Sequence, residues 1–417
     1  MRLTTFFKTA LNLTSPVTAV TLETDPSERP VVVVDVKSRR KHARCGECDR
    51  KCSRRHGAAE KVRTWRHLGM FGITVQLRAE VYRVVCKWCG VRTTGVPWSR
   101  TGSVFTRQFE DEVAWFLQHT DQTATATYFG ISWVTAGKIA QRVVAEKLDG
   151  SLLSNLRLIG VDEICYGRPK KFLTVVVDHE RQRVVWAAEG KSSETLNRFF
   201  NELGPERSAL IEVVTMDMSA AYAKSAAACV PRAEIVFDRF HVVRLLLDAV
   251  DEVRRDQMRA LDGDDRKVLK KSRFPLLKNP WNLTRKENQK LAEIQKNNQP
   301  IYRAYLLKEG FQDIYNSPTL EDADQKFAEW YGWARRSQLD PFIRLAQTLR
   351  SHWAGIRRFI ELRITNAAVE GYNSKIRMIS HRAFGFHSSQ ALIAMIMLLC
   401  SGITISPLGQ GNALHTL

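Results

Sequence analysis

Hydrophobic and polar positions follow two different periods in the first third of the chain. The runs "VVVVDV" and "ITVQLRAEVYRVV" lie within residues 31–98, between basic loops. Short valine-rich or alternating runs of this kind are typical of strands. Within residues 105–148 the spacing changes, and in "FEDEVAWFLQH" apolar residues recur every three or four positions, as in a helix. We therefore expect a small β module followed by a helical one.

The pattern changes twice more toward the C-terminus. Between residues 156 and 240, β-rich runs alternate with helical stretches: "LRLIGVD", "KFLTVVVD", "RVVWAAE", "LIEVVTMD" and "EIVFD". From about 242 to 400 the chain predicts helices, charged until about 355 and more apolar afterwards. The run "ALIAMIMLLC" at 391–400 is too short to span a bilayer and predicts a buried helix. The start "MRLTTFFKTALNLTSP" lacks the features of a secretory signal, so we expect an intracellular protein without membrane contact.

Charge adds a partner class to this picture. The 417 residues include 63 Lys and Arg against 44 Asp and Glu, which gives a formal net charge of +19. Residues 1–100 alone hold 20 basic and 8 acidic residues, or +12 of that total. Such an excess favours a polyanionic partner, most commonly nucleic acid. A basic protein without such a partner is the weaker alternative, because the charge is concentrated in one region.

Two C-x-x-C pairs, "CGEC" and "CKWC", lie 37 residues apart in the basic region. Four thiolates in this arrangement can hold one Zn²⁺ tetrahedrally, and they leave no open position for catalysis. We therefore predict a structural zinc site at Cys45, Cys48, Cys86 and Cys89. Cys52 and His56 are close enough in sequence to replace a ligand. A redox pair and unliganded core cysteines are the other interpretations.

Basic residues crowd the first cysteine pair in "KSRRKHARCGECDRKCSRRHG". Beside a zinc module, such a cluster favours contact with DNA phosphates over a merely solvated face. The residues that we expect to make these contacts are Arg39, Arg40, Lys41, Arg54 and Arg55.

The stretch "QTATATYFGISWVTAGKIAQRVV" predicts a helix-turn-helix. A short helix over Thr123–Phe129 would meet Gly130 at a tight turn, and Ser132 would cap a second helix. The second helix would then enter a DNA major groove. Its candidate contacts are Trp133, Thr135, Lys138 and Arg142. Paired short helices also occur in ordinary bundles, so plain packing is the alternative.

Carboxylates follow two of the apolar runs. Asp162 ends the run in "IGVDE", and Asp217 ends the run in "LIEVVTMDMSAAY". If the strands are neighbours, both could bind divalent cations, which prefer oxygen ligands and can promote phosphoryl transfer. A third carboxylate, Glu370, begins a predicted helix that carries Lys375 and Arg377 for phosphates. Any one of these acids alone is more often a capping or turn residue; the combination on a basic chain favours a metal site.

These stretches together resemble the insertion-sequence transposases of the ISL-three family. The resemblance covers nearly the whole chain. Besides the cysteine pairs it includes "TWRHLG", "GVDE", "FLTVVVDHERQRVVWAAEGK" and "VTMDMSAAY". Its most specific parts are "FDRFHVVRLLLDAVDEVRR" at 237–255 and "TNAAVEGYNSKIRMISHRAFGF" at 365–386.

The resemblance implies an α+β multidomain fold. A zinc-binding N-terminal domain (1–100) and a helix-turn-helix DNA-binding domain (101–150) would precede an RNase H-like catalytic core. That core would comprise residues 151–250 and the C-terminal helices 351–417, interrupted by an all-helical insertion at 251–350. Asp162 and Asp217 would lie at the ends of its adjacent first and fourth strands, and Glu370 would return on a C-terminal helix, with Glu361 as the alternative if that register is wrong.

The resemblance also implies a reaction. Asp162, Asp217 and Glu370 would be an Asp-Asp-Glu triad that holds two Mg²⁺, or Mn²⁺ in their place; the Zn²⁺ would be structural and belong to the N-terminal domain. The chain would bind the terminal inverted repeats of its element through residues 1–150, cleave there with metal-activated water and join 3′-hydroxyls to target DNA. We expect a homodimer on paired ends at the nucleoid of a bacterial cytoplasm.

Some assignments stay open at this point. A non-catalytic zinc and helix-turn-helix regulator derived from a transposase is the alternative function, and an RNase H-like nuclease or resolvase without strand joining is a third. Asp178 leads into "HERQR", which predicts a hairpin turn instead of a catalytic acid. Asp238 and His241 either support the carboxylate site or form a structural hydrogen bond.

Overall fold

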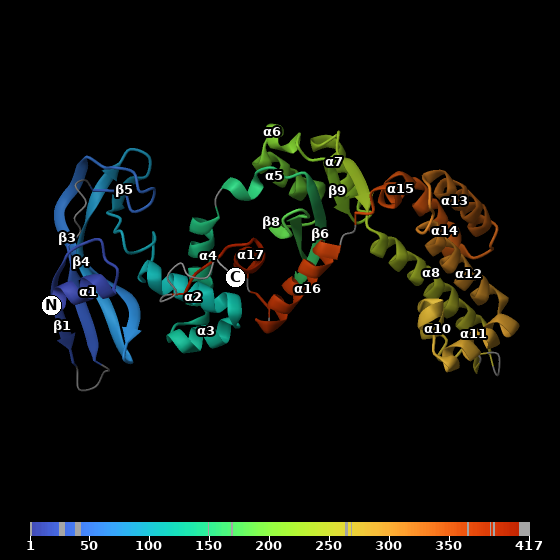
Figure 1. Cartoon of the computed structure of the whole chain (residues 1–417), viewed down its shortest axis with the longest axis horizontal. Helices are drawn as coiled ribbons and strands as arrows, with labels where there is room; N and C mark the ends of the chain where they lie inside the picture. The colour runs from blue at the N-terminus through green and yellow to red at the C-terminus, as the bar shows by residue number, and fades with distance from the viewer. Residues whose placement is uncertain are drawn as a thin grey trace. The chain divides into compact units, whose positions relative to one another are not determined.

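The structure is a computed structural model of the chain that describes residues 2–24, 30–37, 43–148, 150–167, 170–262, 266–267, 269–364, 367–383, 385–386 and 388–407. The chain divides into two compact units (Figure 1). The first unit is Met1–Asp149 with His381–Leu417, and the second unit is Gly150–Ser380.

A five-stranded sheet forms the N-terminal part of the first unit. Its strands are β1 (Val17–Glu23), β2 (Val31–Val36), β3 (Arg54–Met70), β4 (Ile73–Cys86) and β5 (Gly90–Thr93). They lie in the order β1-β2-β4-β3, β5 pairs with β4, and helix α1 (Leu3–Ala10) packs against β1. Trp65 and Trp98 meet edge to face in the core, with ring centroids 5.5 Å apart. The predicted strands "VVVVDV" and "ITVQLRAEVYRVV" are confirmed as β2 and β4.

Strand β3 does not follow from the hydrophobic pattern. It covers 17 residues that include Arg54, Arg55 and Arg63, and it pairs along β4 with two irregularities in register. Because β3 is an edge strand of the sheet, its outward positions can be charged without desolvation. Trp65 and His67 are buried on its inner side. Charged edge positions therefore hide the two-residue period that would identify it.

Four helices complete the first unit: α2 (Arg107–His119), α3 (Gln122–Phe129), α4 (Trp133–Lys147) and, from the C-terminal end of the chain, α17 (Ser389–Cys400). Helix α17 packs against α4 and α2 and has eight buried residues, which confirms the predicted buried helix. The side-chain amide of Gln118 donates to the carbonyls of Leu398 and Ile403 at 2.8 and 2.9 Å. Helix α17 therefore belongs with the helix-turn-helix, whereas residues 351–417 were all expected in the catalytic core.

A second five-stranded sheet forms the centre of the second unit. All five β-rich runs are confirmed as strands: β6 (Leu158–Gly167), β7 (Lys171–Asp178), β8 (Arg183–Glu189), β9 (Val213–Met216) and β10 (Glu234–Phe237). Their order is β10-β9-β6-β7-β8. Strands β6, β7 and β8 are antiparallel neighbours, whereas β9 runs parallel to both β6 and β10.

Three α-helices accompany the sheet (Figure 1): α5 (Ser193–Leu203), α6 (Pro205–Ser208) and α7 (Ala220–Cys229). The short 3₁₀ helix η1 (Gly150–Leu153) precedes the first strand, β6. After β10 the second unit is helical throughout the residues that are described. Its elements are α8 (Arg239–Ala260), α10 (Arg273–Leu277), η2 (Pro280–Asn282), α11 (Arg285–Asn297), α12 (Gln299–Ile314), α13 (Leu320–Arg335), α14 (Asp340–Ser351), α15 (Trp353–Leu362) and α16 (Ala367–Arg382).

Helix α15 returns to the sheet at β10. A Cβ atom on Gly355 would lie 2.4 Å from the ring of Phe237, so only glycine permits this close approach.

Within the described residue ranges given above, every helix is too short or too polar to cross a bilayer.

Candidate functional site

Asp162 lies within a strand. The prediction placed it at the end of its strand, but β6 continues to Gly167, and Asp162 pairs with Val175 of β7. The pairing of β6 with β9 ends at Gly160, however. Asp162 is therefore two residues beyond the last β6 residue paired with β9, on backbone that β7 still holds rigidly.

Asp217 comes directly after β9, as predicted, and so reaches the same edge of the sheet. One carboxylate oxygen of Asp162, one of Asp217 and one ring nitrogen of His241 all lie within 4.8 Å of one another. The backbone N–H of Ser219 donates to Asp217 at 3.1 Å. Parallel pairing of two neighbouring strands thus brings together two acids that are 55 positions apart in the sequence.

Burial makes this pair of acids costly without a cation. Asp162 is only 5% exposed, and desolvation raises the pKa of its carboxyl group above the usual value. Desolvation also raises the pKa of Asp217, and the charge of Asp162 raises it further. Two ionised carboxylates in such surroundings repel each other, and a bound cation would offset that repulsion.

His241 joins the two acids from the first turn of α8. Its Nδ1 atom lies 3.0 Å from Asp238 Oδ2, and Asp238 is itself buried and caps α8 through the backbone N–H of Phe240. This hydrogen bond raises the pKa of His241, and the carboxylates of Asp162, Asp238 and Asp217 add to the effect. Because Asp238 engages Nδ1, Nε2 is the nitrogen that remains for a ligand. Asp238 and His241 thus form a hydrogen bond with each other, and His241 also borders the carboxylate site.

Helix α16 approaches Asp162 through Asn373, a residue that the sequence reasoning missed. The Asn373 side-chain amide donates to Asp162 Oδ2 and is buried, while the backbone N–H of Glu163 donates to Oδ1 at 2.7 Å. The Oδ1 atom of Asn373 is buried without a donor among the described residues. An unsatisfied oxygen at this position fits a site that takes up a hydrated cation.

Glu370 lies one helical turn before Asn373 and on the same face of α16. Desolvation raises the pKa of its carboxyl group, as do the charges of Asp238 and Asp162, so Glu370 borders the site. Among the described side chains, however, its carboxylate is outside the set of Asp162, Asp217 and His241 that could share one ion. The alternative acid, Glu361, is an exposed residue of α15 that pairs with Arg358.

The expected phosphate contacts of α16 differ in position. Arg377 is exposed and lies seven residues after Glu370, on the same helix face. Lys375 is half-buried, and its spacing from Glu370 places it on another face of the helix.

Asp178 lies away from the carboxylate site, at the end of β7. Its buried carboxylate accepts hydrogen bonds from the backbone N–H groups of Glu180 and Arg181, and so organises the turn between β7 and β8.

The four cysteines of the two C-x-x-C pairs come together in the first unit, with all four sulfur atoms within 4.8 Å of one another. The sulfurs of Cys48 and Cys86 are 3.7 Å apart. Zn–S bonds of about 2.3 Å in a tetrahedron give sulfur–sulfur distances of about 3.8 Å, so the spacing fits zinc. Backbone hydrogen bonds from Trp88 and Cys89 lower the pKa of the Cys86 thiol, whereas the hydrogen bond with Cys48 raises the pKa of the Cys89 thiol. The fit to zinc therefore rests on the positions of the four sulfur atoms.

The two rival zinc ligands are outside the group of four sulfur atoms. Cys52 is buried beside the group, but its thiol bonds to the carbonyl of Arg50, and His56 is exposed on β3. Gly46, within the first C-x-x-C pair, lets the chain approach β5, because a Cβ atom there would lie 2.5 Å from the Thr93 carbonyl oxygen. Arg54 and Arg55 are exposed on β3. Arg39, Arg40 and Lys41 lie outside the described residues.

The helix-turn-helix has the predicted boundaries within one residue. Gly130 ends α3 in the left-handed conformation (φ 56°), and the Ser132 hydroxyl caps α4 by accepting from the Thr135 N–H. Lys138 is exposed, next to Val134 one turn earlier. Trp133 packs near Phe386, with ring centroids 6.0 Å apart, and the Thr135 hydroxyl bonds to Ser132.

Arg142 requires a correction. Its guanidinium bonds to the carboxylate of Glu110 at 2.8 and 2.5 Å, and Glu110 is fully buried between Arg142 and Arg100. A buried carboxylate needs such partners. We therefore reassign Arg142 from DNA contact to an ion pair that joins α4 to α2. Helical spacing alone could not reveal this partner, which is 32 positions away.

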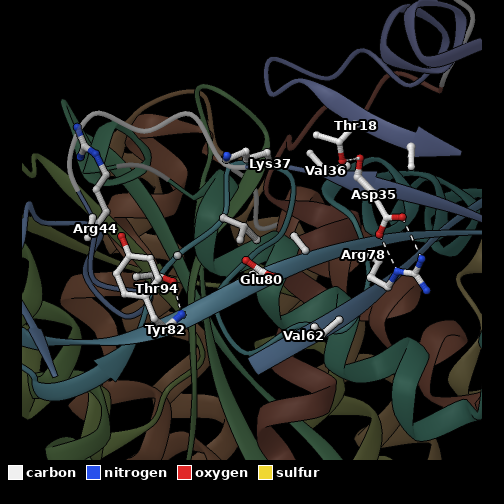
Figure 2. Close-up of a pocket in the computed structure, with 15 residues that line it drawn as sticks. Thr18, Asp35, Val36, Lys37, Arg44, Val62, Arg78, Glu80, Tyr82 and Thr94 are labelled. Atoms are coloured by element: carbon white, nitrogen blue, oxygen red, sulfur yellow. Dashed lines mark hydrogen bonds and ion pairs between the residues drawn. The ribbon is translucent and has the colours of Figure 1, made fainter. Parts of the chain in front are cut away.

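A cavity of about 490 Å³ lies beside the cysteine group in the first unit, between β1, β2 and β4 (Figure 2). Its arginines are already paired. Arg78 forms two bonds with Asp35, at 2.6 and 2.9 Å, and a third with Glu23, while Arg44 pairs with Asp49. The ion pairs of Arg78 tie β1 and β2 to β4, and its hydrogen bond to Asp35 lowers the pKa of that carboxyl group. The cavity is therefore part of the module's internal structure.

Comparisons with known proteins agree with each of these parts. Residues 41–89 match the zinc-finger of the transposases of IS204, IS1001, IS1096 and IS1165. Residues 96–144 match the helix-turn-helix domain of transposase family ISL3, and residues 159–396 match the DDE transposase domain of the same family.

Individual relatives extend the match over most of the chain. The transposase for insertion sequence element IS1557 of Mycobacterium tuberculosis is 37% identical over 385 residues, which cover 86% of each chain. The transposase for IS1001 of Bordetella parapertussis is 30% identical over 350 residues, which cover 83% of this chain and 86% of that one. With its zinc ribbon, helix-turn-helix and DDE domain in this order, the chain belongs to the ISL3 (ISL-three) family of insertion-sequence transposases.

Proposed function

We propose that the chain is an active transposase that binds the terminal inverted repeats of its element, cleaves DNA at the ends and joins the freed 3′-hydroxyls to target DNA. The observation that carries this proposal is the convergence of Asp162, Asp217 and His241 within 4.8 Å at one edge of the second sheet. Burying two carboxylates side by side destabilises the fold unless a cation is bound. A regulator without catalysis would gain nothing from keeping them.

The second unit supports an RNase H-like core interrupted by a helical insertion. Three antiparallel strands followed by two parallel ones, in the order β10-β9-β6-β7-β8, place the first strand of the unit beside the fourth. Helices α8 to α14 then separate the last strand from α15 and α16. Glu370 is thus carried back toward the strands by a helix more than 100 residues after β10.

Asp162, Asp217 and Glu370 would hold two Mg²⁺, for which carboxylate oxygens are the preferred ligands. When bound, the ions would activate a water or hydroxyl nucleophile and neutralise charge on the phosphate during in-line displacement. Asn373 would hold Asp162 in its rotamer through the hydrogen bond to Oδ2. Asp238 would orient the imidazole of His241 toward the carboxylates, as an outer hydrogen-bond partner commonly does for a ligand histidine.

Positive side chains near the acids would bind the DNA backbone. Arg377 has the position for this on α16, and Lys375 would contribute from the neighbouring face. Arg244, exposed one turn after His241, is close enough for its charge to favour the ionised form of Asp217.

The first unit would read the element's ends. Lys138 and Thr135 of α4 are the proposed base or phosphate contacts, with Val134 exposed beside Lys138 for an apolar contact. Trp133, packed near Phe386, would support the helix more than read DNA. Arg54 and Arg55 of β3, together with Arg39, Arg40 and Lys41, would bind phosphates. The structural Zn²⁺ at Cys45, Cys48, Cys86 and Cys89 would hold this module together, and a homodimer would pair the two ends in the bacterial cytoplasm at the nucleoid.

The direct test uses purified protein, Mg²⁺ or Mn²⁺ and a labelled duplex that carries one end of the element. Nicks at the end and joined products are scored on a denaturing gel. A protein that binds the end but gives neither product with either ion would support the non-catalytic regulator instead. Nicks without joined products would support a nuclease.

A further inference from the structure

The net positive charge of the chain comes from two stretches. Residues 1–100 carry 20 basic and 8 acidic residues, and residues 266–296 carry ten basic and two acidic ones. The rest of the chain holds 33 basic and 34 acidic residues and is nearly neutral. The first stretch belongs to the DNA-binding unit. The second, which we call the α10–α11 segment, belongs to the unit that carries the carboxylates, and the proposed function assigns it no role.

Much of this charge is available to a partner. Lys278 pairs with Glu287, Lys290 with Glu293, and Arg273 approaches Asp251. Five further basic residues are exposed and have no ion pair with a described acidic residue: Lys270, Lys271, Arg285, Lys286 and Lys296. A run of like charges in so short a segment is destabilising unless an anion neutralises it.

Two large aromatic side chains stand among these charges. Phe274 in α10 is 64% exposed, and Trp281 in η2 is 75% exposed. Exposed tryptophan is unfavourable in water, and nothing in the described chain covers this one. Aromatic faces interspersed with Lys and Arg are the arrangement on which unstacked nucleic-acid bases pack.

The segment is held rigidly enough to serve as a platform. Lys308 of α12 is fully buried, and its ammonium donates to the carbonyls of Leu276 and Lys278, each at 3.0 Å. Thr284 and Glu287 form a reciprocal capping box that begins α11 just after Trp281. Helix α10 also packs against α8 and α11, and Figure 1 shows α10 and α11 side by side. The exposed aromatics therefore sit on fixed backbone.

We propose that the α10–α11 segment is a second nucleic-acid surface that binds a DNA strand with unpaired bases. Trp281 and Phe274 stack on the bases, and Lys270, Lys271, Arg285 and Lys286 bind the phosphates without reading sequence. An acidic protein would match the charge but not require two exposed rings, and a duplex would offer only its backbone. Helix α8, which carries His241 in its first turn, is 22 residues long and spans about 33 Å toward this segment. At about 3.4 Å per nucleotide along one strand, about ten nucleotides would cover the length of α8, from the carboxylates to the platform.

The test locates the contact directly, because the first unit also binds DNA. Full-length protein is mixed with a single strand of unrelated sequence that carries 5-bromouracil, without Mg²⁺ or Mn²⁺ so that cleavage plays no part. After irradiation, the crosslinked peptide is identified by mass spectrometry. We expect an adduct on the peptide that contains Trp281. It should be lost in Trp281→Ala and retained in Trp281→Phe. Trp88→Ala, which removes another largely exposed tryptophan, in the first unit, should leave it unchanged.

Binding constants provide the second arm. Trp281→Ala should weaken single-strand binding about 5- to 100-fold. Changing Lys270, Lys271, Arg285 and Lys286 to Gln should reduce the slope of log K against log salt by about 3. A melting temperature no lower than that of the wild type, together with unchanged zinc content, shows that these variants are folded. Adducts confined to the first unit, with wild-type binding by both variants, would overturn the proposal. So would a surface that binds duplex as tightly as single strand and does not respond to Trp281→Ala. Neither outcome bears on cleavage, so the proposed function is tested separately.

Discussion

Replacing Asp162 by Asn should make the cation-free protein more stable while it removes activity. Asp162 and Asp217 have ligand oxygens within 4.8 Å, which corresponds to a repulsion of about 3.5 kcal/mol at an effective dielectric constant of about 20. The charge on His241 and the hydrogen bonds to Asp162 offset part of this. We expect a net gain on the order of 2 kcal/mol, or about 4–8 °C in the melting temperature for a unit of this size.

The structure can accommodate the new amide. The Asp162 oxygens now accept from Glu163 N–H and from the Asn373 amide. An Asn at position 162 would present an NH₂ group to one of these donors. Asn373 can resolve that conflict by turning its amide, because its buried Oδ1 has no described donor and would then accept. The stabilisation should therefore not be lost to an unpaired polar group.

Asp178→Asn is the matched control. Asp178 is also a buried acid of the same sheet, but its carboxylate accepts from the N–H groups of Glu180 and Arg181 and pairs with the Arg181 guanidinium. Loss of these charge-assisted bonds should lower stability by about 1–3 kcal/mol. The same chemical change should thus have opposite signs at positions 162 and 178.

The pH dependence of the difference follows from the raised pKa of Asp162. Below the ordinary Asp value of about 3.9 the group is protonated in both folded and unfolded protein, so its ionisation has no effect on stability. As pH rises through the folded-state pKa, the folded protein loses stability relative to Asp162→Asn. The stability difference between the variant and the wild type should therefore be greatest at neutral pH and vanish near pH 4.

Differential scanning calorimetry in buffer without divalent cations, and again with Mg²⁺ or Mn²⁺, measures these effects. Added ion at about 100 times its dissociation constant should stabilise the wild type by about 2.7 kcal/mol and the variant much less. A variant that melts below the wild type without cations, or that gains as much from the ion, would refute the view that repulsion between Asp162 and Asp217 prepares a cation site.

Five further outcomes are expected. Zinc content near one per chain should fall when Cys86 is changed to Ser, as measured by metal analysis, and an unchanged content would exclude the four-cysteine site. Lys138→Ala should weaken binding to the element's end more than to random duplex at unchanged melting temperature. Arg142→Ala should lower stability by about 1–3 kcal/mol, because the buried Glu110 carboxylate loses one partner and keeps Arg100 and Ser103. Deleting residues 388–417 uncovers the faces of α4 and α2 that α17 covers, so end binding in a gel-shift assay should drop sharply. Asp238→Asn should weaken Mn²⁺ binding by calorimetry about 10- to 100-fold, and equal affinity would limit Asp238 to capping α8.

Local patterns in the sequence predicted the parts of the fold that local interactions determine. Valine-rich and alternating runs identified the strands β2, β4 and β6 to β10. Gly130 and Ser132 identified the turn and the cap of the helix-turn-helix, because a left-handed glycine and a capping hydroxyl act within a few residues. The paired cysteines were readable for the same reason: the spacing within each pair determines which ligands point to one ion.

Features that depend on distant partners were not predictable in this way. The position of α17 on α4 unites segments about 250 residues apart, and an apolar helix alone does not indicate which surface covers it. The pairing of Arg142 with Glu110 and the bond from Asn373 to Asp162 likewise arise only when helices pack. Strand β3 was missed because its exposed edge tolerates arginine, and the continuation of β6 beyond Asp162 depends on β7.

Cleavage and joining of an element end test the central claim most directly. Wild-type protein with Mg²⁺ and a labelled terminal inverted repeat should give nicks at the end and products joined to target DNA. Asp162→Asn, Asp217→Asn and Glu370→Gln should each reduce both products on the order of 10²-fold or more, because electrostatic stabilisation is typically the largest catalytic contribution. All three should still bind the end. Full cleavage by the three variants would contradict the account, and an active Glu370→Gln beside an inactive Glu361→Gln would contradict its assignment of the third acid.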